Sequence, residues 1–278
     1  MNAPEALFPA NWTKAKSQAD LVKLAKSILL EPTGLSEQDL HHTFSNMFSH
    51  QLDDADLYFQ HTRSESWSLE EGIVKSGSFN IDQGVGVRSI YGDKTAFAYS
   101  DEINLDALNK AAKATRVIGP TGGKQAIASK IFNPLSNQLY GDLNPLDSLK
   151  PQEKIALLES IERRAKARDP RIIQVMASLA GEFDVVLVVR ADGLLAADVR
   201  PLVRVSVHVI AEQNGRRESG SSGGGARHDY LYFDATLLPM LSPPLPWHSV
   251  RHGGYLITNV QLIRLPDYAT KHTERLSS

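Results

Sequence analysis

The sequence predicts an α+β fold in which helices pack on a largely antiparallel mixed sheet, with an incomplete second domain. Short runs rich in aromatic and β-branched residues follow one another between Asp56 and Tyr99, and the turns between them are too short for helical crossovers. Apolar residues at helical spacing precede and follow these runs. With 278 residues and 42% hydrophobic content, the chain can bury a substantial core.

Four helices are expected. Leu21–Ile28 carries an apolar face, and Pro32 with Gly34 ends the run. Ser36 is a favourable N-cap for a second helix, with Asp39 in its first turn. The third and fourth helices are expected from Leu105 to Val117 and from Pro151 to Asp169-Pro170, because proline suits a first helical turn and disfavours helix before it.

Strands are expected in two groups. In the first group, glycine-containing turns at 76–78, 82–84 and 92–94 separate the runs 56–60, 67–76, 85–91 and 95–99. In the second group, the runs 172–179 and 185–189 precede a valine alternation from Val203 to Val209. The alternation predicts a strand with one face packed in the core and the other face exposed to solvent or covered by a partner.

Three segments follow from these patterns. Residues 1–150 form a first domain that ends in a Gly-, Pro-, Asn- and Ser-rich linker from Gly119 to Lys150. Residues 151–236 begin a central domain that ends in a glycine-rich loop. Residues 237–278 form a tail that holds five of the fourteen prolines and only two acidic residues, and it has no sustained period. We expect this tail to be disordered.

Composition excludes several functions. A formal net charge of −2 gives no general attraction for nucleic acid or for an anionic membrane. The absence of cysteine removes disulfides, thiolate zinc ligands and a cysteine nucleophile. The N-terminus lacks the pattern of a secretory signal, and no apolar run is long enough to span a membrane. We therefore expect a cytoplasmic protein without a nucleic-acid or membrane partner.

A run of serine and glycine, Ser219–Ala226, is the first candidate site. Flexible backbone amides can bind anions, but the Gly-Lys-Ser/Thr ending of a phosphate loop is absent, and the residues that follow read as a strand rather than a helix. A close-packed or mobile loop that lines a cleft is the favoured interpretation. Its candidate residues are Ser221, Ser222, Gly223, Gly224, Gly225 and Arg227.

Histidines provide the second set of candidates. His248 and His252 have a spacing used by zinc hydrolases, but Ser249 stands where such enzymes carry the glutamate that activates water. Other histidines in or near amphipathic segments are better explained as packed or surface residues than as metal ligands. These are His41, His42, His50 and His61.

Two further groups of residues lack the partners that catalysis needs. Ser221 and Ser222 have no identifiable His/Asp partner. The adjacent carboxylates Asp53-Asp54 and Glu70-Glu71 point to different sides of an element, which favours solvated positions. No catalytic or metal-binding residue is predicted in this chain.

Several ordered segments resemble the N-terminal part of the TldD/PmbA family, and most closely its TldD branch. The resemblance covers roughly Leu35 to Phe233 and is strongest at 192–204 and 214–227. It also runs through the following segments: Asp56–Gln60, Glu65–Lys75, Gly77–Arg88, Lys94–Asp101 and Gln174–Leu179.

The resemblance implies a cytoplasmic zinc metallopeptidase that works with a PmbA/TldE-like subunit on unfolded or small peptides. It also implies that the matching parts, with the Ser/Gly run among them, shape the subunit interface and one wall of the substrate channel. In such proteins a His-Glu-x-x-x-His helix downstream of the glycine-rich stretch supplies zinc ligands and the glutamate that activates water. No His-Glu pair occurs in this sequence, so no catalytic residue is carried over and no cofactor is expected for this chain.

The sequence is therefore interpreted as a TldD-like metallopeptidase subunit that is truncated before its zinc helix and inactive alone. The alternative is a non-catalytic module that binds peptides or a partner, for example by strand addition. A nucleotide-binding enzyme is a more distant alternative. The abrupt change after about Thr236 further suggests that the tail is a frameshifted reading of the gene.

Overall fold

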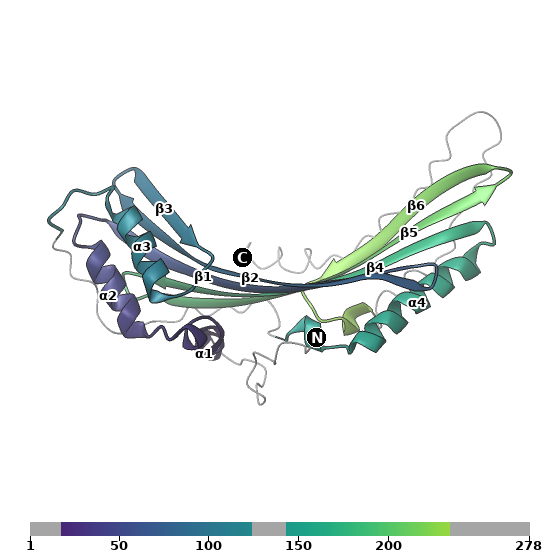
Figure 1. Cartoon of the computed structure of the whole chain (residues 1–278), viewed down its shortest axis with the longest axis horizontal. Helices are drawn as coiled ribbons and strands as arrows, with labels where there is room; N and C mark the ends of the chain where they lie inside the picture. Colours follow the sequence, from purple (N-terminus) through teal and green to yellow (C-terminus); the bar gives the residue numbers. More distant parts are fainter. Residues whose placement is uncertain (1–17, 124–142, 234–278) are drawn as a thin grey trace, which may run out of the picture.

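The computed structural model describes residues 18–123 and 143–233. These residues form one six-stranded sheet in the order β3-β2-β1-β4-β5-β6, and every neighbouring pair is antiparallel. Helices cover one face of the sheet, so the predicted α+β class is confirmed (Figure 1). The strands are β1 (Asp54–Glu70), β2 (Ile73–Tyr91), β3 (Lys94–Ser100), β4 (Ile172–Arg190), β5 (Leu195–Gln213) and β6 (Arg216–Ala226).

The helices begin and end close to the predicted positions. Ser36 caps α2 through its hydroxyl, which accepts from Asp39 N, while the Asp39 carboxylate accepts from Ser36 N in return. Asp169 is the C-cap of α4, immediately before Pro170. The α-helices are α1 (Gln18–Leu29), α2 (Glu37–Met47), α3 (Leu105–Arg116) and α4 (Pro151–Arg168), and the 3-10 helices are η1 (Glu31–Thr33) and η2 (Pro145–Asp147).

The strands are much longer than predicted. The expected turn at 76–78 lies inside β2, and so does the one at 82–84; the β1–β2 turn is instead at Glu71-Gly72, both with positive φ. The runs predicted as two strands in 172–189 form the single strand β4. The turn predicted near Gly92 is confirmed between β2 and β3.

Alternation along the strands separates two faces. Ala55, Leu57 and Phe59 of β1 are buried toward the helices, as are Val203 and Val205 of β5. The packed face predicted for the Val203–Val209 run is therefore confirmed. Figure 1 shows the sheet as a curved layer, with α1 and α2 beneath one end and α4 beneath the other. The opposite, concave face bears no described helix.

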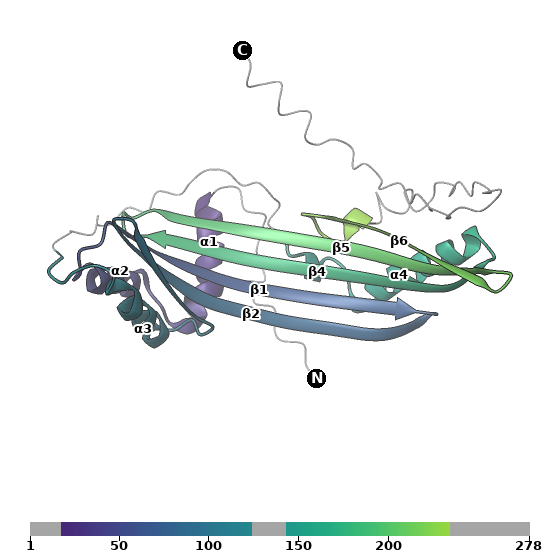
Figure 2. The ribbon, with the colours of Figure 1, turned by 90° about the horizontal axis from the view of Figure 1, so that it is seen from above.

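The covered face holds two apolar clusters. The α1–α3 core joins the first three helices to one end of the sheet and includes Leu57, Phe59 and Leu187. The α4 core lies at the other end and includes Leu69, Leu158 and Val205. Since β1, β4 and β5 contribute to both clusters, the two cores share one sheet (Figure 2).

Candidate functional site

The predicted glycine-rich loop is a strand. Ser221 to Gly225 lie within β6, which pairs with Val203–Gln213 of β5, and Arg227 follows directly after the strand. The expectation of a loop is wrong because strand β5, which is strongly β-forming, supplies a complete ladder for its weakly β-forming neighbour. The sequence motif therefore marks the edge of the sheet.

Two glycines of β6 are required by close approach to β5. A Cβ atom on Gly223 would lie 2.5 Å from the Val205 carbonyl oxygen, and one on Gly225 would lie 2.6 Å from the Val203 carbonyl oxygen. Gly220 differs, because its nearest neighbour would be a methyl of Val209 at 3.9 Å. Any side chain at 223 or 225 would push β6 away from β5.

The outer edge of β6 is unpaired within the described residues. In the strand order β6 is terminal, and it pairs with β5 alone. Roughly half of the backbone N–H and C=O groups of such a strand point away from its only neighbour. Because serine and glycine dominate from 219 to 225, small side chains flank this edge. The edge can thus form hydrogen bonds with the backbone of an added strand, and its small side chains select little among the side chains of that strand.

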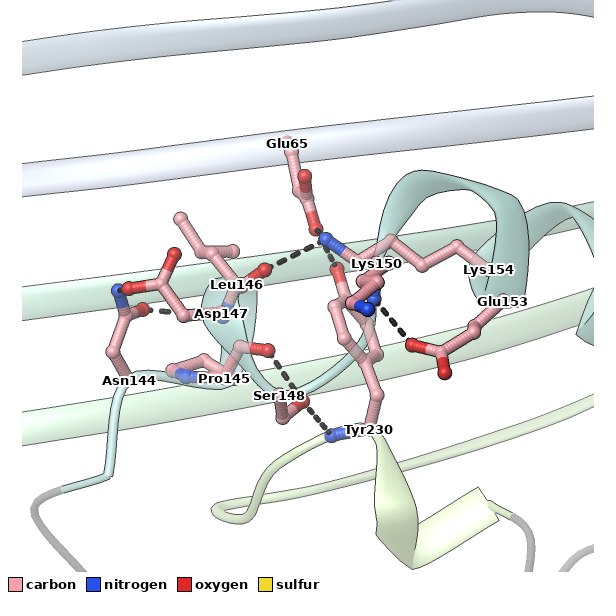
Figure 3. A network of polar contacts seen from close by, with 10 residues as sticks. All are labelled: Glu65, Asn144, Pro145, Leu146, Asp147, Ser148, Lys150, Glu153, Lys154 and Tyr230. Carbon is pink, nitrogen blue, oxygen red and sulfur yellow. Dashed lines mark hydrogen bonds and ion pairs between the residues drawn. The ribbon is translucent and has the colours of Figure 1, made fainter. Parts of the chain in front are cut away.

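A buried polar network anchors the chain where it leaves this strand (Figure 3). The Tyr230 hydroxyl donates to Glu65 Oε1 of β1 at 2.9 Å. Lys154 Nζ of α4 donates to the same oxygen at 2.5 Å and to the Leu146 carbonyl of η2 at 2.7 Å. Tyr230 N also donates to Ser148 Oγ at 3.2 Å. Four separate segments therefore meet at one tyrosine.

The network is deeply desolvated. The Lys154 and Glu65 side chains are 3% and 9% exposed, and Lys154 Nζ lies 5.1 Å from the centre of the Tyr230 ring. Burial, together with the Glu65 charge and its hydrogen bond, raises the pKa of Tyr230 far above its ordinary value. Tyr230 is thus held as a neutral hydrogen-bond donor.

Gly181 of β4 makes room for Tyr230. A Cβ atom on Gly181 would lie 2.2 Å from the Tyr230 hydroxyl oxygen and 2.9 Å from a methyl of Leu146. This glycine therefore allows the phenol to reach across β4 to Glu65. The prediction that residues 227–233, which follow the Ser/Gly run, form a strand is wrong, since residues 231–233 adopt a helical turn.

A shallow hollow of about 250 Å³ lies beside this network. Its lining includes Leu149, Leu157 and Leu231 together with Tyr230. The Glu153 carboxylate, which also lines it, accepts from Lys150 N at 2.6 Å and so serves the start of α4. This combination can seat an apolar group but offers no pair of groups for acid–base catalysis.

The other sequence candidates do not come together. His41 and His42 lie on α2, His50 follows that helix, and His61 is buried on β1. Asp53 Oδ2 accepts from Gly92 N at 2.6 Å, and Asp54 pairs with Arg190, so both carboxylates have structural roles.

Glu70 and Glu71 also stay apart from any reactive cluster. Glu70 accepts a hydrogen bond from Gln174, and Glu71 occupies the β1–β2 turn.

A metal centre is not formed by the described residues. Within 18–123 and 143–233, no group of three His, Asp or Glu side chains is placed to hold a metal ion. The two histidines at zinc-like spacing, His248 and His252, lie outside the described residues. No helix in the described part is long and apolar enough to cross a membrane.

Two regions of the chain match models of one known protein family. Residues 55–129 match the PmbA/TldA metallopeptidase domain 1, and residues 144–241 match the PmbA/TldA metallopeptidase central domain. Through these two regions the chain belongs to the PmbA/TldD metallopeptidase family. The first matched region supplies β1–β3 and α3, and the second supplies α4 and β4–β6.

Curated relatives match the same part of the chain. A metalloprotease TldD homolog of Haemophilus influenzae is 45% identical over 216 residues, covering 77% of this chain and 44% of the relative. One from Buchnera aphidicola subsp. Schizaphis graminum is 41% identical over 216 residues, covering 76% of this chain and 44% of the relative. The chain thus spans less than half the length of these relatives.

Solved structures share the fold at low identity. A proposed modulator of DNA gyrase from Thermotoga maritima superimposes with a TM-score of 0.53 at 16% identity, covering 69% of this chain and 43% of that one. TldE from Thermococcus kodakarensis gives a TM-score of 0.50 at 12% identity, covering 74% of this chain and 46% of that one.

The C-terminal segment matches a different family. Residues 225–278 match a DNA-directed RNA polymerase N-terminal model, and the mouse mitochondrial RNA polymerase is 44% identical over 46 residues. That stretch is 16% of this chain and 4% of the polymerase. The match argues against a frameshifted tail, because a shifted reading frame would not reproduce another protein's sequence. The predicted disorder of 237–278 concerns residues outside those described.

Proposed function

We propose that this chain is the peptide-holding part of a TldD-like metallopeptidase. The observation that carries the proposal is the outer edge of β6, which is unpaired in the described part and flanked by glycine and serine. An extended, unfolded peptide can add to such an edge through main-chain hydrogen bonds whatever its side chains. A small or unfolded peptide is therefore the substrate class that fits.

Peptide hydrolysis would then require a zinc centre that this chain does not supply alone. None of its nine histidines is followed by glutamate, and the described residues hold no cluster of metal ligands. The chain would act with a PmbA/TldE-like subunit in the cytoplasm. The proposed TldE-like partner is supported only by the similarity of this fold to that of TldE.

Peptide binding can be tested by fluorescence anisotropy with labelled, unstructured peptides of differing sequence. We expect comparable binding of all of them to the wild-type chain and weakened binding to Gly223→Ala, whose new Cβ meets the Val205 carbonyl. Gly220→Ala is the matched control, because its new methyl makes only an ordinary contact. Equal binding by the two variants would place the peptide elsewhere.

Activity should be measured on the same preparation. We expect no cleavage and no stoichiometric zinc by elemental analysis, with or without a TldE-like subunit. Cleavage by the chain alone, or about one tightly held zinc per chain, would contradict the proposal.

A non-catalytic binding module is the second candidate, and the same β6 edge favours it. Co-purification with a complete TldD-like protein and its TldE-like subunit separates the two candidates. If this chain enters a complex that cleaves peptides, the first candidate, a part of a TldD-like metallopeptidase, is supported. Peptide binding without such exchange supports the free-standing module.

A further inference from the structure

The sheet has a second uncovered edge, on the side opposite to β6. Strand β3 pairs with Val85–Tyr91 of β2, and the remaining stretch, Ile73–Gly84, pairs with β1 alone among the described residues. Viewed from above (Figure 2), this half of β2 is the outermost strand. Twelve consecutive residues therefore present one row of backbone groups without a described strand partner.

Apolar side chains stand along this edge. Phe79 is 45% exposed and Ile81 is 42% exposed, and both lie on the face that the helices cover elsewhere. Their stretch lies between the α1–α3 core and the α4 core. Exposed phenylalanine and isoleucine side by side on a free strand are a feature that soluble proteins usually avoid, and their presence indicates a binding surface.

A buried arginine with two unsatisfied donor atoms lies directly beside these side chains. Arg63 of β1, opposite Ile81, is 9% exposed, and its Nε and Nη1 atoms have no hydrogen-bond partner among the described residues. Its guanidinium carbon lies 5.4 Å from the centre of the Phe79 ring. Trp67 Nε1, on the same face of β1, is likewise buried with no acceptor in the described part of the chain. Both orphan groups are donors, so a ligand that completes them must bring acceptors.

Within 18–123 and 143–233, no carboxylate accepts a hydrogen bond from Nε or Nη1 of Arg63. The carboxylate two residues along the same face is Glu65, whose Oε1 already accepts from Lys154 and Tyr230. On the other side stands His61, and burial together with the Arg63 charge lowers the pKa of His61, which keeps the ring uncharged. A desolvated guanidinium without a counter-charge is costly, and a carboxylate is its preferred bidentate partner.

We propose that the free edge of β2 from Ile73 to Gly84 docks an extended segment of a partner protein that carries a carboxylate, which pairs with Arg63. The segment adds to the sheet in line with β3 and lays apolar side chains against Phe79 and Ile81. This site is independent of the peptide-holding role of β6, because the two edges lie on opposite sides of the sheet.

The probe is a blocked, labelled nine-residue peptide of alternating threonine and valine with one central glutamate. Its control carries glutamine at the centre. We expect the glutamate peptide to bind the full chain at least about tenfold more tightly, since hydrogen bonds to charged groups are the stronger ones. Hydrogen exchange should show the glutamate peptide protecting residues 73–84.

Two variants locate the charge effect. Arg63→Met should bring the two peptides to equal affinity, while its unfolding midpoint holds or rises because an unpartnered buried charge is lost. Lys75→Met removes an exposed cation from the same edge and should leave the ratio unchanged.

Four outcomes overturn the inference. The first is equal binding of both peptides by the wild type, and the second is an unchanged ratio in Arg63→Met. The third is protection confined to residues 216–226, which would leave the proposed role of β6 standing. The fourth concerns Glu5, a carboxylate in the chain's own N-terminal segment. If Glu5→Gln binds the glutamate peptide tenfold more tightly than the wild type does, Glu5 competes for the site, and the occupant is this segment rather than a partner protein.

Discussion

At the scale of single residues, the network at Tyr230 shows how one buried charge pair fixes several elements. Glu65 and Lys154 are 89 positions apart, and Glu65 and Tyr230 are 165 apart. A buried ion pair adds little net stability over an apolar pair of the same shape, but losing one partner is expensive. The network therefore selects one arrangement of β1, α4 and the segment after β6.

The first prediction follows from that asymmetry. Lys154→Met leaves the Glu65 carboxylate buried with only the Tyr230 hydroxyl as a donor partner in the network, and it should lower the free energy of unfolding by about 3–5 kcal/mol. Adding Glu65→Leu should recover part of this loss, because the orphan charge is then removed as well. Urea denaturation of the single and double variants measures both effects.

The control for this prediction is an exposed pair. Lys110→Met breaks the contact with Asp106, where both side chains are 76% exposed, and should leave the unfolding midpoint unchanged. A double variant less stable than Lys154→Met alone would show that Glu65 is not the source of the loss.

His61 gives a prediction about pH. Its pKa is lowered in the folded chain, first by burial and then by the Arg63 charge. The unfolded chain takes up a proton near pH 6.5, whereas the folded chain does so only at lower pH. The contribution of His61 to stability is therefore complete above about pH 6.5 and is lost as the pH falls through the lowered pKa.

Unfolding of wild type and His61→Gln at pH 8 and pH 5.5 measures this contribution. The variant should lose less stability between the two values than the wild type does. The exposed His42→Gln should behave like the wild type. A wild-type loss no greater than that of His61→Gln would contradict the prediction.

At the scale of elements, the sequence predicted the helices better than the strands. Helix ends depend on local signals such as the Ser36 cap and Pro151 in the first turn, and these signals are read directly from neighbouring residues. Strand lengths depend on distant partners. The sequence predicts a turn at Gly77 and leaves a gap between the predicted runs 172–179 and 185–189. Gly77 instead lies in a strand, where an added Cβ would be 3.4 Å from the Trp67 ring, and Gly181 makes room for Tyr230.

The candidate site shows the same limit. The Ser/Gly run was identified as a special segment, but its identity as an edge strand depends on the β5 ladder, which sequence spacing does not reveal. The Tyr230 network could not be predicted at all, since its members come from four separate segments. The orphan donors on Arg63 and Trp67 were likewise invisible, because burial is decided by tertiary contacts.

The glycines of β6 give the element-scale prediction. Gly223→Ala should loosen the pairing of β6 with β5, because the new methyl would collide with a backbone oxygen that cannot move aside. Hydrogen exchange of residues 216–226 should quicken, while exchange of β1 and β4 stays unchanged. Gly220→Ala, with 3.9 Å to its nearest atom, should exchange like the wild type. Equal exchange in both variants would mean that close approach does not explain these glycines.

At the scale of the whole molecule, one sheet joins two cores. Strand β1 carries Leu57 into the α1–α3 core and Leu69 into the α4 core, and β4 and β5 divide their buried residues in the same way. The two regions that match separate family domains therefore share backbone ladders across β1 and β4. Sequence boundaries between family domains do not coincide with independent hydrophobic cores here.

This sharing predicts one cooperative unfolding transition for the described part. Leu187→Ala in the α1–α3 core and Leu158→Ala in the α4 core each remove a fully buried side chain, and each should lower the free energy of unfolding by about 2–5 kcal/mol. Because β1, β4 and β5 run through both cores, each variant should speed exchange at both ends of these strands. Circular dichroism during urea unfolding, combined with hydrogen exchange, tests this. Two separate transitions, each moved by only one of the variants, would show instead that the cores unfold independently.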